Sequence, residues 1–327
     1  MSNKKLTAVS LFSGCGGMDL GFIMAGFNIL WANDINQFAC ETYALNFGNH
    51  IVCDNIDNID YKDIPNSDII IGGFPCQDFS MLWKRNGINT ERGNLYKNFV
   101  DLVSIKNPKV FVAENVKGIL TANKKQAIKR IIDDFSKTGI YGYNVQVNLV
   151  NFADYGVPQL RERVLIIGVR NDLKKTFNIP KKTNTPENYI SSRKALIGVE
   201  KVKFNNEHQN IKKETIEKLK LIPPGGNFSD IPKDSPYYVK GMISHVYRRL
   251  DPDKPSTTII AAGGGGTWGY HYKEPRPLTN RERARLFGYP DSFEFKGSIS
   301  EVRKQIGNSV PPTGILPFAK VIKEMLD

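Results

Sequence analysis

The sequence predicts an α/β protein, with a parallel sheet covered by helices on both faces and a smaller loop-rich region. Short β-branched runs alternate with amphipathic stretches over the first 170 residues, and this alternation stops at Asn171. The composition, 40% hydrophobic and 24% charged over 327 residues, is typical of a globular protein. A chain of this length can form a large domain and a smaller one.

Individual elements follow from these patterns. Runs bounded by Gly, Asn or Asp are predicted strands at residues 7–12, 27–33, 68–73, 109–116 and 163–170. Apolar residues at helical spacing predict helices at 18–27, 37–47, 94–105 and 124–137. Strands that alternate with helices in this way form a parallel sheet.

The second region, residues 171–275, contains Lys-, Asn- and Pro-rich loops, one helical stretch at 212–222 and a glycine run at 263–266. Helical signals then return. Thr279 is placed as an N-cap, and the two prolines at 311–312 open a final helix that we expect to pack on the first domain. We therefore predict one domain from residues 1–170 and 300–327, and a second from 171–299.

The charge is strongly basic, at +12 with a pI near 9.4. Residues 171–275 hold 18 basic and 11 acidic side chains. Such an excess indicates either a polyanion partner or a solvated lysine-rich face, and charge alone does not decide between them.

Several classes of protein are excluded. No apolar run approaches the roughly 18 residues of a membrane span, and the N-terminus lacks a signal-peptide pattern, so we expect a cytoplasmic protein without membrane contact. The four cysteines form no C-x-x-C pair and the four histidines are scattered. We therefore expect neither a disulfide framework nor a bound metal.

A glycine-rich turn joins the first strand to the first helix. Gly14, Gly16 and Gly17 allow a ligand to approach the backbone, and Asp34 follows twenty residues after Gly14, where a carboxylate can bind ribose hydroxyls. Asp19 stands where a dinucleotide fingerprint needs glycine. The turn therefore favours a nucleoside-bearing cofactor, and the alternative is a purely structural turn.

Two strand ends carry candidate catalytic groups. Cys76 follows Pro75 at the end of strand 68–73, and Glu114 ends strand 109–116 at the same predicted sheet edge. Alone, Cys76 would be interpreted as an inert buried thiol. We expect burial to raise the pKa of Glu114 so that it can hold a proton, and the alternative is a helix-capping glutamate.

Arg161 and Arg163 form a third candidate group, on one side of the stretch QLRERV. The alternative is a surface ion pair. A thiol, a carboxylic acid, an arginine and a nucleoside cofactor together suggest conjugate addition, in which a thiolate attacks C6 of a pyrimidine and C5 accepts a methyl group.

The chain resembles the bacterial DNA (cytosine-5)-methyltransferases of restriction–modification systems. The motifs run in the family's order from Val9 to the C-terminus, except in the variable region 171–255: LFSGCGGMDLGF, Asp34, Asp54, GGFPCQDFS, ENV, QLRERV, RPLTNRERARLFGYPDSF and QIGNSVPP. The resemblance implies a Rossmann-like S-adenosylmethionine-dependent methyltransferase domain with a mixed, mostly parallel sheet over 1–170 and 300–327, and a target-recognition domain over 171–299.

The resemblance also implies roles for single residues. Cys76 matches the nucleophile, Glu114 the acid at N3 and N4 of the cytosine, and Arg163 the arginine at its O2, with Arg161 near the DNA backbone. S-adenosylmethionine is the implied cofactor and S-adenosylhomocysteine the product. The matching cofactor positions are Phe12, Gly14, Gly16, Gly17, Asp34, Ile35, Asp54, Asn55, Pro75, Leu95, Asn308 and Val310. Ile35 departs from the family because many relatives have an aromatic residue there, and CDNI at 53–56 carries one extra residue.

The implied partner is double-stranded DNA. A cytosine must leave the duplex before C5 and C6 can react. Residues 77–95 resemble the loop that closes over DNA, and Thr258–Ile259 resembles a Thr-Ile element of the target-recognition domain. The candidate DNA contacts are Ser80, Arg85, Arg92, Arg248, Arg249, Thr258, Ile259, Gly263 and Gly264. For Arg248 and Arg249, simple solvated charge is an equal alternative.

We expect a monomer, and a cognate restriction endonuclease encoded nearby is a candidate partner. One alternative is a tRNA cytosine-5 methyltransferase, but the cysteine motif of that group generally begins with two prolines, whereas this chain has Phe74–Pro75. A non-catalytic DNA-binding relative would have no need of Cys76, Glu114 and Arg163. An oxidoreductase with a dinucleotide fold is disfavoured by Asp19.

Overall fold

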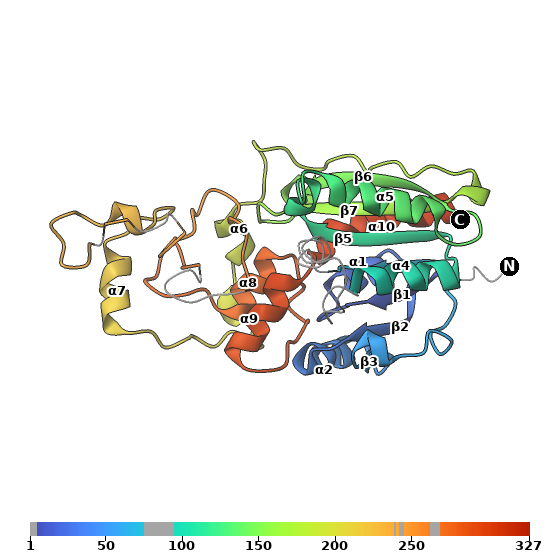
Figure 1. The fold of residues 1–327 in the computed structure, drawn as a ribbon. Coiled ribbons are helices and arrows are strands. Elements are labelled where there is room, and N and C mark those ends of the chain that lie inside the picture. The colour runs from blue at the N-terminus through green and yellow to red at the C-terminus, as the bar shows by residue number, and fades with distance from the viewer. Residues whose placement is uncertain (1–4, 75–94, 239, 242–244, 262–268) are drawn as a thin grey trace. The chain divides into compact units, whose positions relative to one another are not determined.

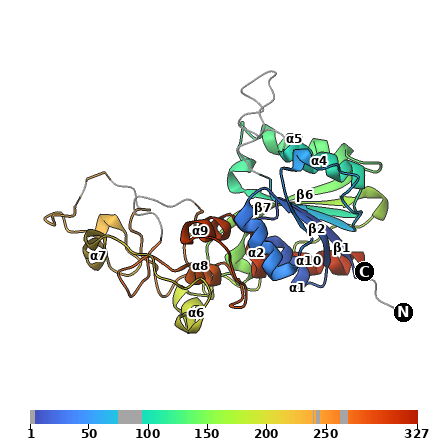
Figure 2. The same cartoon turned by 90° about the horizontal axis from the view of Figure 1, so that it is seen from below.

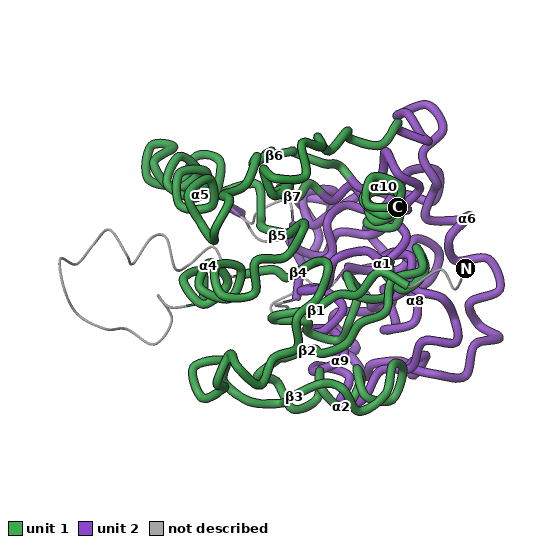
Figure 3. Tube along the Cα trace, turned by 90° about the vertical axis from the view of Figure 1, so that its right-hand side faces the viewer, with its two compact units in different colours: residues 1–151, 162–181, 315–327 green, residues 152–161, 182–314 purple. Residues whose placement is uncertain are grey.

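The structure is a computed structural model that describes residues 5–74, 95–238, 240–241, 245–261 and 269–327. The chain forms two compact units (Figure 3). Unit 1 contains residues 1–151, 162–181 and 315–327, and unit 2 contains residues 152–161 and 182–314. The predicted domains were assigned by function and have other bounds, so that assignment stays a prediction.

The described part of unit 1 contains a seven-stranded sheet with the order β3-β2-β1-β4-β5-β7-β6. Strands β1 to β5 are parallel, while β7 runs antiparallel to both β5 and β6. The predicted mixed, mostly parallel sheet is thus confirmed. The strands are β1 (Thr7–Leu11), β2 (Asn28–Asp34), β3 (Ile51–Cys53), β4 (Ile69–Gly72), β5 (Val110–Val116), β6 (Tyr143–Asn151) and β7 (Glu162–Arg170).

Helices cover both faces of this sheet (Figures 1 and 2). Helices α4 and α5 lie on one face, and α1, α2 and α10 lie on the other. The aromatic rings of Phe99, Phe111 and Phe135 pack together under α4 and α5, and Phe111 stacks on Phe135 at 4.2 Å. The helices are α1 (Gly17–Met24), α2 (Gln37–Phe47), α4 (Leu95–Lys106), α5 (Gln126–Lys137) and α10 (Pro312–Leu326).

The sheet has a topological switch point at β1. From β1 the chain runs to β2 and β3 on one side, then returns to form β4 and β5 on the other. Leu11 pairs with Asn33 of β2 and with Gly72 of β4, so these strands end at one edge of the sheet. Ligands of open α/β sheets bind at such an edge.

Strands β3 and β6 were missed by the sequence analysis. β3 has only three residues, too few for a pattern. β6 is an outer strand in which Val145, Val147 and Leu149 alternate with Asn144, Gln146 and Asn148, and most of its side chains are only half-buried. Alternation of this kind is typical of a half-buried edge strand and could have predicted β6.

Unit 2 has little regular structure: α6 (Ser192–Leu196), α7 (Lys213–Lys220), α8 (Asn280–Leu286) and α9 (Ile299–Asn308), joined by long loops. Thr279 caps α8 as predicted, because its side chain accepts a hydrogen bond from the amide of Glu282. The predicted start of α10 at Pro312 is also confirmed, and its residues from Ile315 onward belong to unit 1.

Candidate active site

The glycine-rich turn lies at the end of β1 in the conformation that its glycines permit. Gly14 and Gly16 have φ of 54° and 87°, and Phe12 shares the left-handed region at 54°. A Cβ on Gly16 would lie 2.3 Å from the Phe47 ring, whereas one on Gly14 would meet no described atom within 4 Å. Gly16 is therefore required by packing, and Gly14 faces open space that a ligand can occupy.

Asp34 is held at the neighbouring strand end. One carboxylate oxygen accepts a hydrogen bond from the Gly14 amide and the other accepts one from the Asn36 amide, both at 2.8 Å. Burial raises the pKa of this carboxyl, and the hydrogen bonds from the two amides offset part of that rise. Each oxygen keeps a further lone pair, so the group can also accept bonds from the hydroxyls of a ribose. Ile35 beside it is 72% exposed.

Asp54 and Asn55 follow the end of β3, one strand further along the same edge. The Asn33 side chain fixes this chain segment by donating to the carbonyls of Val52 and Asp54 at 3.0 and 2.9 Å. Asp54 is exposed and accepts from the Asn55 amide. Three adjacent strand ends thus carry groups that fit a nucleoside. The glycine turn follows β1, the fixed carboxylate of Asp34 ends β2, and the acidic residue Asp54 follows β3.

Glu114 lies at the end of β5 and forms an ion pair with Arg163 of β7. Glu114 Oε1 is 2.9 Å from Arg163 Nε, and about an eighth of each side chain is exposed. A Cβ on Gly73 would lie 3.2 Å from Glu114 Oε2, so glycine at this position leaves room for the carboxylate. Burial lowers the pKa of Arg163, and the charge of Glu114 opposes that shift.

Asn115 fixes the chain just before the candidate nucleophile. Its side-chain amide donates to the Phe74 carbonyl at 2.8 Å and its oxygen accepts from the Val116 amide. The Phe74 ring is buried against Tyr96 of α4, 5.2 Å away between centroids. Leu95, a predicted cofactor residue, begins α4 and is half-buried. Pro75, Cys76, Ser80, Arg85 and Arg92 lie outside the described residues.

Arg161 and Arg163 are not brought together. Arg161 belongs to unit 2, is 1% exposed, and donates to the carbonyls of Ile259, Gly307 and Ser309. In the same unit Asn308 is exposed and Val310 is buried.

The predicted DNA contacts of unit 2 differ in exposure. Thr258 is exposed and its hydroxyl donates to the Leu160 carbonyl at 2.6 Å, while Ile259 and Arg248 are half-buried.

Arg249 is 7% exposed, and its guanidinium donates to four carbonyls, of Leu219, Ile222, His271 and Tyr272. Neither reading proposed for Arg249 from sequence, a DNA contact or solvated charge, fits this buried side chain. We correct its assignment and leave Arg249 out of the DNA-binding set. Gly263 and Gly264 lie outside the described residues.

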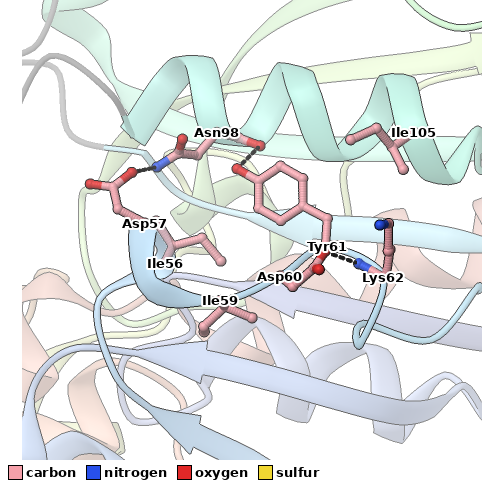
Figure 4. A pocket seen from close by; sticks show the side chains of 8 residues that line it. All are labelled: Ile56, Asp57, Ile59, Asp60, Tyr61, Lys62, Asn98 and Ile105. Carbon is pink, nitrogen blue, oxygen red and sulfur yellow. Dashed lines mark hydrogen bonds between the residues drawn. The ribbon is translucent and has the colours of Figure 1, made fainter.

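A cavity of about 390 Å³ lies in unit 1 between α4 and the chain that follows β3 (Figure 4). Its polar groups bond to one another: Asn98 donates to Asp57 at 2.8 Å, and the Tyr61 hydroxyl donates to the Asn98 carbonyl. None of the predicted catalytic or cofactor residues lines it, so we assign it no role in the site. It is lined by Ile56, Asp57, Ile59, Asp60, Tyr61, Lys62, Asn98 and Ile105.

A family model described as C-5 cytosine-specific DNA methylase matches residues 6–324. The chain belongs to this family. The family predicted from the sequence is thereby confirmed.

Named relatives agree with this membership. Type II methyltransferase M.NgoFVII of Neisseria gonorrhoeae is 58% identical over 329 residues, which cover 98% of this chain and 87% of that protein. Type II methyltransferase M.BbvI of Brevibacillus brevis is 41% identical, with 96% and 88% covered.

Solved structures of other methyltransferases share the fold. One described as a DNA modification methyltransferase encoded within an E. coli prophage has a TM-score of 0.77 at 26% identity, over 98% of this chain and 99% of that one. The Dnmt2 methyltransferase of S. pombe has a TM-score of 0.68 at 18% identity over 99% and 100%, which shows a common fold alone.

The residues that the structure describes contain no helix with the length and apolar character needed to cross a membrane. Within the same ranges, no cluster of three or more His, Cys, Asp or Glu side chains could hold a metal ion.

Three positioning side chains escaped the sequence analysis of this methylase. Asn115 was noted only as part of ENV, although its place next to Glu114 at a strand end was a usable signal. Asn33 ends a strand and resembles an ordinary strand boundary. Asp19 was interpreted only as a break in a fingerprint, yet it is fully buried and accepts hydrogen bonds from Ser10 and Tyr43.

Proposed function

We propose that this chain transfers a methyl group to C5 of a cytosine within a specific short sequence of duplex DNA. We further propose that it is the modification enzyme of a restriction–modification system. Family membership and the type II methyltransferases among its relatives support both statements. The structural observation that carries the proposal is the Glu114–Arg163 ion pair at the end of β5, beside Gly73.

The methyl donor implied by the family is S-adenosylmethionine, which supplies a methyl group on a sulfonium centre. The residues at the ends of β1, β2 and β3 fit its nucleoside. Asp34 would accept from the ribose hydroxyls, Gly14 faces open space at the turn, and Asp54 would accept from the adenine amino group. Asn308 and Val310 of unit 2 also match cofactor positions of the family, as the resemblance implies.

The target base would be held by the ion pair. Protonated Glu114 can donate to N3 of a cytosine and accept from its N4 amino group, and Arg163 can donate to O2. When the Cys76 thiolate forms a bond to C6, electrons of the C5=C6 bond move toward N3, where Glu114 provides the proton. C5 thereby becomes nucleophilic enough to accept the methyl group. Loss of the C5 proton, departure of the Cys76 sulfur and return of the N3 proton to Glu114 restore the aromatic ring.

The base must leave the helix for this chemistry, at a cost of a few kcal/mol. The basic residues between 171 and 275 would offset this cost through phosphate contacts, and loops of unit 2 would read base edges in the major groove. We expect the enzyme to act as a monomer beside a cognate endonuclease.

The decisive experiment is bisulfite sequencing of plasmid DNA from cells that express the gene. Methylated cytosines at one repeated short sequence are expected. An unmethylated plasmid, together with methyl transfer to tRNA by the purified protein, would establish the tRNA alternative instead.

The covalent step has its own test. Purified Cys76→Ser protein should bind DNA but transfer no methyl group from labelled S-adenosylmethionine, whereas Cys53→Ser, at an exposed thiol, should remain active. DNA with 5-fluorocytosine at the target should trap the wild-type protein, because fluorine replaces the proton that must leave. Methyl transfer by Cys76→Ser at the wild-type rate would contradict the mechanism.

A further inference from the structure

Arg161 is an arginine in the interior of unit 2 whose hydrogen bonds join two segments far apart in the sequence. Its Nη2 donates to the carbonyls of Gly307 and Ser309, both at 2.9 Å, and its Nη1 donates to that of Ile259 at 3.3 Å. The guanidinium also lies over the Phe287 ring, 4.7 Å from its centroid.

The first of these segments contains Asn308, one of the proposed cofactor residues. The two carbonyls that accept from Nη2 belong to the residues on either side of Asn308, whose own side chain is exposed. A Cβ on Gly307 would lie 2.3 Å from the backbone of Ala261. The Gly307–Ser309 backbone is therefore fixed both by the guanidinium and by direct contact with the residue two positions after Ile259.

The second segment is the proposed recognition element. An isolated parallel β-bridge between Gln159 and Ser256 joins this element to residues 158–161. Leu160 donates to the Ser256 carbonyl at 2.8 Å, and the Ile259 amide donates to the Gln159 side chain at 3.2 Å. The Ile259 carbonyl then accepts from Arg161. A single guanidinium thus connects the recognition element to the backbone around Asn308.

This arrangement requires an arginine at position 161, and it prevents the guanidinium from contacting a DNA phosphate. A guanidinium has donors in a planar fork, so it can bridge three carbonyls while one face lies on a ring. A lysine ammonium has no planar fork and is a compact, strongly hydrated charge. At 1% exposure, the side chain would have to break these bonds to reach DNA.

We propose that Arg161 is a positioning residue that holds the Gly307–Ser309 backbone, and with it Asn308, in the conformation that binds the methyl donor. It also ties this backbone to the Thr258–Ile259 element. The proposal rests on the proposed function, because that function assigns Asn308 to the donor site. It replaces the DNA-backbone role that the family resemblance implied.

The first test is binding of S-adenosylhomocysteine without DNA, measured by calorimetry. Arg161→Lys should raise the Kd about tenfold, as expected when hydrogen bonds that fix a binding segment are lost. The matched control is Arg281→Lys, because Arg281 is also fully buried and also donates to carbonyls, of Phe204, Pro290 and Phe293. The control should leave the Kd unchanged, although both variants should melt at lower temperature. Equal effects of the two variants would overturn the proposal.

The second test separates positioning from a phosphate contact. The slope of log K against log salt for DNA binding should be the same in wild type and Arg161→Lys, and in Arg161→Met where that variant folds. A phosphate contact would survive in Arg161→Lys and would reduce the slope by about one in Arg161→Met. Phe287→Leu, which removes only the ring under the guanidinium, gives a milder variant and should raise the Kd for S-adenosylhomocysteine by a smaller factor. An unchanged Kd in both Arg161→Lys and Phe287→Leu would overturn the proposal.

The third test is a double-mutant cycle. Asn308→Ala should weaken S-adenosylhomocysteine binding in the wild-type background but have little further effect in Arg161→Lys, because the backbone is already displaced. Additive effects would overturn the positioning role. Failure of the proposed function is distinguishable: in that case wild type would methylate no DNA, whereas failure of this inference leaves wild type active.

Discussion

Arg161 and Arg163 stand two positions apart in one motif, yet their environments differ completely. Arg163 in unit 1 pairs with the Glu114 carboxylate at a strand end, where part of each side chain is exposed. Arg161 in unit 2 is buried and donates to three backbone carbonyls. One arginine forms an ion pair at a strand end, and the other donates to backbone carbonyls.

The two units explain this difference. In unit 1, the sheet ladders satisfy the backbone carbonyls, so charged side chains at the strand ends remain available for ligands. Unit 2 has long loops and few ladders, and buried carbonyls there need other donors. Guanidinium groups supply them in several places, at Arg161, Arg249 and Arg281. A basic side chain in unit 2 is therefore weak evidence for a DNA contact until its exposure is known.

The strongest test of the chemical role in unit 1 is Glu114→Gln. The variant keeps the shape of the side chain but cannot supply a proton to N3, so kcat should fall about a thousandfold. Steady-state methyl transfer measures this change. Glu162→Gln is the control, because Glu162 is an exposed carboxylate next to Arg163 that pairs with Lys117, and it should stay active. A loss below tenfold in Glu114→Gln would show that the pair is structural, like the arginines of unit 2.

The structural role in unit 2 is tested by Arg249→Met. Four carbonyls would lose a donor, so the free energy of unfolding should fall by about 4 kcal/mol, as denaturant titration would show. The salt dependence of DNA binding should not change. Arg248→Met, at the neighbouring and more exposed position, should have the reverse profile, with a small loss of stability and a salt slope lower by about one. A reduced slope in Arg249→Met would contradict the contrast between the units.

Asp19 shows that a carboxylate of unit 1 can also be structural. Burial raises its pKa to about 6, against 3.8 for an exposed carboxyl, although Tyr43 and Ser10 donate to it. The folded protein therefore binds more protons than the unfolded chain between these values, and the free energy of unfolding decreases as pH rises from about 4 to 6. The decrease amounts to about 3 kcal/mol. Denaturant titrations at several pH values should show this slope in wild type and its loss in Asp19→Asn. The same slope in both proteins would assign the effect to other groups.

The smallest expected effect concerns Asn115. Asn115→Ala removes the donor to the Phe74 carbonyl, two residues before Cys76. The activation free energy should rise by about 2 kcal/mol, so kcat should fall about thirtyfold. Asn115→Asp keeps the acceptor for Val116 but not the donor, so it should lower kcat as well. An unchanged kcat in both variants would remove Asn115 from the site.

The sequence predicted the fold where patterns were local. Five strands and the capped start of α8 followed from β-branched runs and from Thr279, and their places were confirmed. The antiparallel pairing of β7 did not follow, because pairing depends on contacts distant in sequence.

The site was predictable to a similar extent. Asp34 and Glu114 were found because strand ends converge in a parallel sheet. The different environments of Arg161 and Arg163 were not predicted, because alternation along a strand does not determine where a residue just before the strand points. The burial of Arg249 was equally hidden, because its four acceptors come from segments about twenty to thirty residues away in either direction.

The hydrogen bonds between residues 158–161 and 256–259 bear on protein engineering. They hold the end of the long loop region against a segment about a hundred residues earlier, so the position of residues 256–259 is fixed independently of the segment from 182 to 255. Recognition loops from a relative could be grafted between these limits while Ser256 to Ile259 stay native. A graft that replaced those four residues would also disturb the backbone that Arg161 holds.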